Sequence, residues 1–120
     1  AVRANRLALL ARIREATGRT PIIYTAPGFW SGVGGDFGDD TLWVAHWGVS
    51  CPSVPAPWSD WKLWQYSDHG HVPGIGPVVD LDRFNGSAAD LAALAGSADT
   101  APYYRGMAPD PAGDGYWIVG

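Results

Sequence analysis

The sequence has 120 residues, 47% of them hydrophobic and 17% charged, which excludes an intrinsically disordered chain and fits a single domain. A formal net charge of −4, a pI near 5.0 and the lack of a basic block argue against nucleic acid or an anionic membrane as the main partner. No apolar run approaches the roughly 20 residues of a membrane span. Seven Trp and five Tyr are typical of large buried contacts or of flat surfaces on which rings, sugars included, can stack.

The first half of the chain predicts a helix and two buried strands. Residues 2–17 carry apolar side chains at helical spacing, and Gly18 is suited to cap the helix. The apolar stripe consists of Val2, Leu9, Ile13 and Ala16, with Leu7 and Leu10 beside it. Residues 22–25 and 42–47 are short apolar runs typical of strands covered on both faces. The Gly/Asp-rich segment 31–40 predicts a loop, and it lacks the Gly-Lys-Ser/Thr ending of a phosphate-binding loop.

The second half predicts two more strands and a last helix. In chain order we expect a proline-rich loop over 51–57, a strand over 62–66, turns over 68–77, a strand over 78–84 and a helix from Ser87 to Ala95 that ends at Gly96. Helix, turn and buried strand together indicate the α/β class. From residue 97 the composition shifts to Pro, Gly, Asp and Tyr, so we place a domain boundary there. Residues 116–120 again predict a strand. We expect the chain to be a piece of a longer polypeptide.

Polar side chains end the predicted strands. They are Tyr24 and Thr25, then His46 and Trp47, then Gln65 and Tyr66. In α/β barrels the carboxyl ends of the strands carry the active site, so these residues are candidates for one. The alternative is that Tyr24, Trp47 and Tyr66 are core aromatics whose polar tips are satisfied.

Asp80 lies inside the fourth predicted strand, after two valines and before a leucine. A buried carboxylate costs several kcal/mol unless it is paired or hydrogen-bonded, which favours a function for Asp80. Asp82 would point to the same face of an extended strand, and paired carboxylates can divide acid and base roles. The alternative for Asp82 is that it begins a turn or pairs with Arg83.

Two further groups of residues are weaker candidates. The segment Asp68-His69-Gly70-His71 resembles a metal-binding tract with His46 as a third ligand, but such histidines are more often solvated loop residues. Cys51, the only cysteine, excludes an internal disulfide and stands among prolines without an evident general base. We therefore expect neither a metal site nor a cysteine nucleophile.

Four ordered segments resemble one enzyme family. They are Pro21-Ile22-Ile23-Tyr24-Thr25 with Phe29-Trp30, Leu42-Trp43-Val44-Ala45-His46-Trp47, Trp64-Gln65-Tyr66-Ser67, and Val79-Asp80-Leu81-Asp82-Arg83-Phe84-Asn85-Gly86. In this order and spacing, residues 1–96 resemble the C-terminal half of glycoside hydrolase family 25, the Chalaropsis-type lysozymes. The resemblance implies the C-terminal portion of an irregular TIM-like β/α barrel, truncated on its N-terminal side. Residues 97–120 resemble a linker and the start of a Gly-Tyr-Trp-type repeat found in secreted proteins.

The resemblance also implies a secreted peptidoglycan hydrolase that cleaves the β-1,4 bond between N-acetylmuramic acid and N-acetylglucosamine. Its partner would be the glycan strand. It would need no metal or other cofactor, and we expect a monomer. Asp80 matches a late Asp of the family and would be an accessory catalytic carboxylate, with Asp82 where Asn is common. Four positions match residues expected to line the sugar cleft, namely Tyr24, Trp47, Gln65 and Tyr66.

The main catalytic carboxylates of the family, an Asp on the first strand and an Asp-x-Glu pair on a middle strand, have no counterpart in this chain. Its only glutamate, Glu15, lies in the first predicted helix. We therefore expect the chain alone to be inactive. Two other hypotheses stay open: a non-catalytic module that binds cell-wall glycan, and a metal hydrolase that uses His69 and His71.

Overall fold

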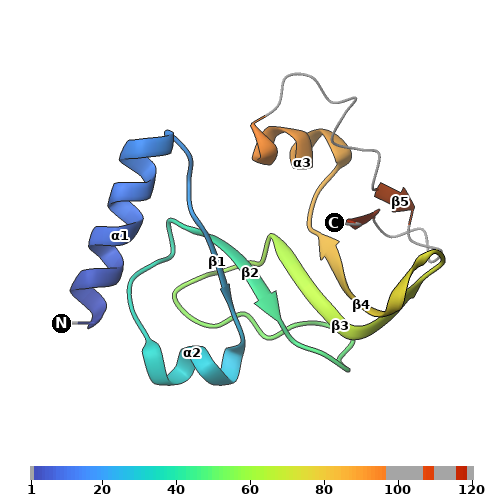
Figure 1. The fold of residues 1–120 in the computed structure, drawn as a ribbon. Coiled ribbons are helices and arrows are strands. Elements are labelled where there is room, and N and C mark those ends of the chain that lie inside the picture. The colour runs from blue at the N-terminus through green and yellow to red at the C-terminus, as the bar shows by residue number, and fades with distance from the viewer. Residues whose placement is uncertain (1, 97–106, 110–115, 119–120) are drawn as a thin grey trace.

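The computed structural model describes residues 2–96, 107–109 and 116–118, which form a mixed α/β fold (Figure 1). Its elements are α1 (Val2–Thr17), β1 (Ile22–Thr25), α2 (Pro27–Val33), β2 (Thr41–Ala45), β3 (Leu63–Val72), β4 (Ile75–Phe84), α3 (Ala88–Ala95), β5 (Met107–Pro109) and β6 (Tyr116–Ile118). None of the described helices is long and apolar enough to cross a membrane.

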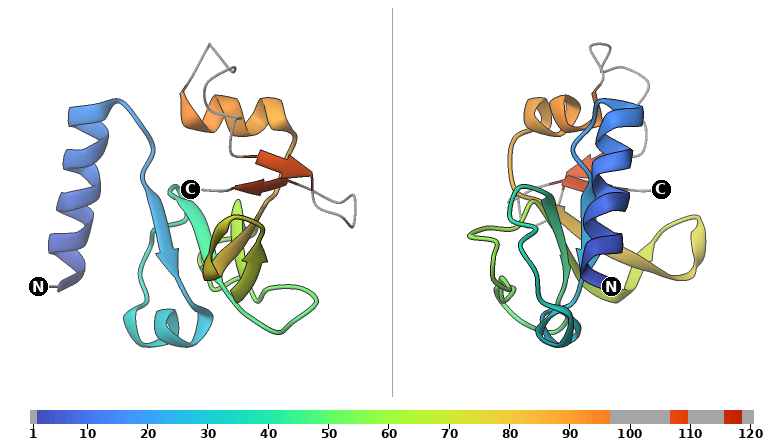
Figure 2. Two further views of the ribbon diagram at one scale, coloured as in Figure 1. Left: turned by 45° about the vertical axis from the view of Figure 1, so that its right-hand side comes forward. Right: turned by 90° about the vertical axis from the view of Figure 1, so that its left-hand side faces the viewer.

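Four strands make the main sheet, in the order β1-β2-β3-β4. The first three are parallel, and β3 and β4 form an antiparallel hairpin that projects beyond the parallel part (Figure 1). Tyr24 aligns with Trp43 across β1 and β2, while Gln65 aligns with Ala45 on one side and Asp82 on the other. β5 and β6 form a separate antiparallel pair, and β6 contacts β4 (Figure 2).

The two faces of the main sheet differ in character because successive strand residues point to opposite sides. One face carries the hydrophobic core, in which Leu42, Val44 and Trp64 are buried. Three aromatic side chains from α2 and the loops cover this face, namely Trp30, Phe37 and Trp58. The other face presents Tyr24, Trp43, Gln65 and Asp82, which contact one another. The core therefore lies behind the face that carries the polar groups.

The two outer helices agree with the sequence prediction to different degrees. The Ser87 hydroxyl accepts from the Asp90 N–H and the Asp90 carboxylate accepts from the Ser87 N–H, so the predicted start of α3 is confirmed. Gly96 ends α3 with φ at 71°, as predicted. The α1 prediction is confirmed in its bounds but not in its buried stripe. Leu9 is 59% exposed and Ile13 36% exposed, whereas Leu10 packs on the core.

Two local predictions are wrong. Residues 31–40 are not all loop, because α2 extends to Val33; Pro27 occupies its first turn, where the missing N–H costs nothing. The expected turns over 68–77 are mostly strand, because residues 68–72 extend β3 and β4 begins at Ile75. Backbone pairing along the hairpin outweighs the turn propensity of this segment, and the chain reverses only at Pro73 and Gly74.

Candidate functional site

β1 and β2 end at one edge of the sheet, where β3 stops pairing with β2, and this edge gathers most of the predicted site. Tyr24 comes from the end of β1, Trp47 follows β2, and Gln65 is where β3 stops pairing with β2. The Tyr24 hydroxyl donates to Gln65 Oε1 at 2.8 Å, and Trp47 Nε1 donates to the same oxygen at 3.2 Å. Both aromatic rings remain about half exposed, so their faces are available to a ligand.

Asp80 joins this group from β4. Gln65 Nε2 donates to Asp80 Oδ2 at 3.3 Å, and the Asp80 side chain is exposed whereas Gln65 is buried. The structure thus brings together Tyr24, Trp47, Gln65 and Asp80 through one amide. Asp80 is not buried in an apolar sheet, as its sequence neighbours suggested, because this part of β4 belongs to the projecting hairpin.

Asp82 lies beside this group and is held by a residue that the sequence analysis did not single out. Trp43 Nε1 donates to Asp82 Oδ1 at 2.6 Å, and the Trp43 ring packs edge-on against Tyr24 with centroids 5.0 Å apart. Asp82 is therefore part of the strand and bonded to an indole, and it does not begin a turn. One pattern points to Trp43. It stands two residues before Ala45, which pairs with Gln65, so side-chain alternation along β2 places Trp43 on the same face of the sheet as Gln65.

The site contains two carboxylates and a phenol that influence one another. Burial raises the pKa of Asp82 and the nearby Asp80 charge raises it further, whereas the bond from Trp43 lowers it. Burial also raises the pKa of the Tyr24 hydroxyl, and the charges of Asp80 and Asp82 add to the effect against the bond to Gln65. Tyr24 is therefore a neutral hydrogen-bond donor at physiological pH, next to an exposed carboxylate.

Tyr66 lies on the other face of β3 and outside this group. Its ring packs against Trp64 with centroids 5.8 Å apart, and the Arg83 guanidinium lies 5.1 Å from its centre. Because Tyr66 is adjacent to Gln65 in an extended strand, the two side chains point to opposite sides. The structure therefore does not bring Tyr66 to the predicted site.

The histidines and the cysteine have separate surroundings. His46 Nδ1 accepts from the backbone N–H of Ser53 at 3.0 Å, and His69 pairs with Asp68 on β3. Within the described ranges, no three His, Cys, Asp or Glu side chains are placed to hold one metal ion. Cys51 is exposed. The metal-hydrolase hypothesis therefore gains no support from this part of the chain.

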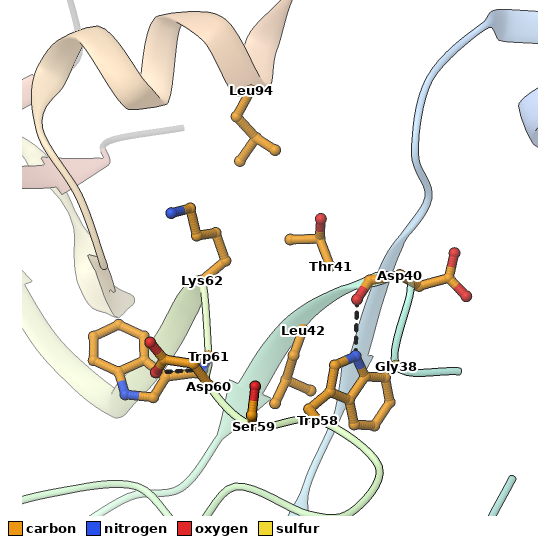
Figure 3. A pocket seen from close by; sticks show the side chains of 10 residues that line it. All are labelled: Gly38, Asp40, Thr41, Leu42, Trp58, Ser59, Asp60, Trp61, Lys62 and Leu94. Carbon is orange, nitrogen blue, oxygen red and sulfur yellow. Dashed lines mark hydrogen bonds between the residues drawn. The ribbon is translucent and has the colours of Figure 1, made fainter. Parts of the chain in front are cut away.

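A pocket of about 260 Å³ lies at the opposite, amino-terminal ends of β2 and β3 (Figure 3). Thr41 and Lys62 form part of its lining, and Leu94 of α3 stands over it. On its other side Trp58 Nε1 donates to the Asp40 carbonyl at 2.8 Å. None of the predicted site residues lines this pocket. The candidate site is instead the open surface at the other end of the strands.

Comparison with known proteins identifies the family of the chain. The sequence profile of glycosyl hydrolases family 25 matches residues 1–75. The chain belongs to glycosyl hydrolase family 25. Lysozyme M1 of Streptomyces globisporus is 45% identical over 89 residues. A family 25 lysozyme structure from Aspergillus fumigatus, described as GH25, superposes with a TM-score of 0.60 at 34% identity, covering 72% of this chain and 41% of that one.

The bacterial lysozyme of Streptomyces coelicolor superposes with a TM-score of 0.66 at 43% identity, covering 72% of this chain and 42% of that one. The match to Lysozyme M1 covers 71% of this chain and 30% of the relative. This family 25 chain thus spans well under half the length of the relatives it matches. The predicted family resemblance is confirmed.

Proposed function

We propose that this chain is the C-terminal part of a lysozyme domain that hydrolyses the β-1,4 bond between N-acetylmuramic acid and N-acetylglucosamine in peptidoglycan. The observation that carries the proposal is the gathering of Tyr24, Trp47 and Asp80 around Gln65 at the strand ends. Exposed aromatic faces suit the stacking of sugar rings, and an exposed carboxylate beside them suits a substrate that develops positive charge. We further propose that the protein acts outside the cell as a monomer without a metal.

Glycoside hydrolysis needs one group that protonates the leaving oxygen and another that stabilises the oxocarbenium-like centre. Asp80 suits the second role, because an ionised carboxylate stabilises developing positive charge. The family's main catalytic carboxylates, which would fill the first role, have no counterpart in this sequence. Glu15, the only glutamate, lies on α1 and pairs with Arg12 at 2.8 Å on an exposed surface. The 120-residue chain would accordingly be inactive by itself.

We propose that residues 1–96 supply one arc of an irregular β/α barrel and that residues 97–120 lie beyond it. Three parallel strands, the first two of them joined by α2, support this proposal, as does the position of β1 at an outer edge of the main sheet. Helix α1 exposes three apolar side chains, those of Leu7, Leu9 and Ile13. Such exposure is expected when part of the surface that a helix packs against is absent.

A segment exchange tests the function. The 89-residue segment of Lysozyme M1 that aligns with this chain would be replaced by the corresponding residues of the chain, giving a chimeric lysozyme. We expect the chimeric lysozyme to clear a peptidoglycan suspension and release reducing ends, while the 120-residue chain does neither. Circular dichroism and thermal unfolding establish that both proteins are folded.

Two outcomes would contradict the proposal. A folded chimeric lysozyme that binds insoluble peptidoglycan without releasing reducing ends would indicate a non-catalytic glycan-binding segment. Clearing by the 120-residue chain alone, abolished by Asp80→Asn, would show that the general acid lies in this chain after all.

A further inference from the structure

Gln65 is buried, with 5% of its surface exposed, and its amide is used at both ends. Its oxygen accepts from Tyr24 and Trp47, and its nitrogen donates to Asp80. An indole N–H can only donate, and an ionised carboxylate can only accept. The amide orientation is therefore fixed by chemistry, because the flipped amide would set N–H against N–H on one side and oxygen against carboxylate on the other.

The two carboxylates of β4 are held differently. Asp82 is half-buried and bonded at 2.6 Å to Trp43, which belongs to the same sheet face. Asp80 is exposed, lies on the projecting hairpin, and accepts from Gln65 at the longer distance of 3.3 Å. Asp82 is thus anchored in the sheet, whereas the direction of Asp80 depends on a hydrogen bond from a buried amide.

We propose that Gln65 is a positioning residue that aims the Asp80 carboxylate and couples it to the sugar-contacting residues Tyr24 and Trp47. This inference rests on the proposed function. The amide is the one group among these residues that bonds to all three others. A sugar ring stacked on Tyr24 and Trp47 would hold the Tyr24 hydroxyl and Trp47 Nε1, which donate to the Gln65 oxygen. Because the amide is planar, a fixed oxygen also fixes the Gln65 nitrogen that donates to Asp80.

The test is Gln65→Glu in the chimeric lysozyme, with kcat and KM measured across pH. The substituted carboxylate still accepts from Tyr24 and Trp47 but cannot donate to Asp80 while it is ionised. We expect kcat at neutral pH to fall about tenfold or more, the range for losing a hydrogen bond to a charged group, with KM within about twofold. As the pH falls, the new carboxyl gains a proton and can donate again, so the ratio of variant to parent kcat should rise.

The groups that set this titration are Asp80 and Asp82 on β4 and the Tyr24 hydroxyl on β1, which the substituted carboxyl would face. Asn85→Asp is the matched control. Asn85 Nδ2 donates to Asp60 Oδ2 at 3.2 Å, so this change also sets a carboxylate against a carboxylate, but away from the site. We expect its kcat ratio to stay flat with pH. A merely structural effect of added charge would instead appear in both variants.

A double-mutant cycle with Asp80→Asn completes the test. If Gln65 acts through Asp80, Gln65→Glu has little further effect on kcat once Asp80→Asn is present. If Gln65→Glu does not fold, the same cycle is run with Tyr24→Phe, which removes one donor to the amide and keeps the ring. Independent, multiplying effects on kcat, or a flat pH ratio for a folded Gln65→Glu, would overturn the inference while leaving the proposed function intact. An inactive but folded parent would overturn both.

Discussion

The indole of Trp43 on β2 reaches across β3 to hold Asp82 on β4, with Nε1 and Oδ1 2.6 Å apart. The two strands are not neighbours in the sheet, so this bond ties together elements that share no backbone hydrogen bonds. It also supplies a half-buried carboxylate with a donor that cannot lose its proton at physiological pH. The bond is therefore a side-chain link between β2 and β4 that crosses β3.

Replacing Trp43 and replacing Asp82 should affect the stability of the protein differently. Trp43→Phe removes the donor and leaves the Asp82 carboxylate half-buried without it, so we expect a loss of about 1–3 kcal/mol in the free energy of unfolding. Asp82→Asn keeps an oxygen acceptor for Trp43 and removes the charge facing Asp80, so stability at pH 7 should be equal or higher. Urea unfolding of the chimeric lysozyme measures both.

The effect of Asp82 on the free energy of unfolding should depend on pH, with a sign that follows from its raised pKa. Because its pKa in the folded protein is raised, the folded state holds the Asp82 proton more tightly than the unfolded state does. The stability that this proton confers is present below the unfolded pKa and is lost as the pH rises through the folded pKa. The advantage of Asp82→Asn over the parent should therefore grow with pH in the acid range and then level off. An advantage that shrinks with rising pH would contradict the assignment.

The two carboxylates should also differ in activity. Asp80→Asn keeps the shape of the side chain and removes its charge, so we expect kcat of the chimeric lysozyme to fall on the order of 10²-fold or more, with little change in melting temperature. Asp82→Asn should cost far less, since Asp82 is bonded to Trp43 and only half-exposed to the site. If Asp82→Asn were the more damaging change, Asp82 would be the carboxylate that faces the sugar.

The hairpin should depend on the glycine at position 70. A Cβ placed on Gly70 would lie 2.3 Å from Cγ of Leu81, whereas one on Gly76 would meet nothing within 4 Å. We expect Gly70→Ala to lower the free energy of unfolding by about 1–3 kcal/mol through overpacking. Gly76→Ala is the matched control, and it should leave the unfolding curve nearly unchanged. Equal effects of the two substitutions would show that Leu81 and the hairpin backbone can shift to accommodate a Cβ at position 70.

Truncation tests the proposed domain boundary. Residues 97–120 lack the periodicity of a packed element, and α3 ends at Gly96. We expect deletion of 97–120 to shift the melting temperature of the chain by less than about 5 °C. The contact of β6 with β4 makes this a real test. A larger drop would show that the β5–β6 pair belongs to the same folding unit.

Local signals predicted most of the elements. Ser87 marked the start of α3, and short apolar runs marked β1, β2 and the first part of β3. The hairpin was missed because its length comes from pairing between two segments, each of which has weak strand character by itself. Helix α2 was missed because Gly28 and Gly32 lower its propensity, while its stability comes from burying Trp30.

The sequence indicated the grouping of residues that strand ends bring together, but it did not indicate the contacts that depend on the tertiary structure. Tyr24, Trp47 and Gln65 come together because β1 and β2 end, and β3 stops pairing with β2, at one edge of the sheet. Tyr66 was assigned to the same edge although alternation places it on the other face of β3. The link between Trp43 and Asp82 spans 39 positions in sequence and could not be found from spacing.

The alternation along β3 has a consequence for how this protein can change over evolution. Leu63 and Gln65 face one side and Trp64 and Tyr66 the other, so inserting or deleting one residue would exchange the two sets. Gln65 would then enter the aromatic core, and Trp64 would occupy the place of the amide. Substitutions can modify the two sides independently, but a length change between Leu63 and Gln65, before the first irregularity in the pairing with β4, would disrupt both at once. Length changes in the loops outside β3 would leave the alternation of side chains along this strand unchanged.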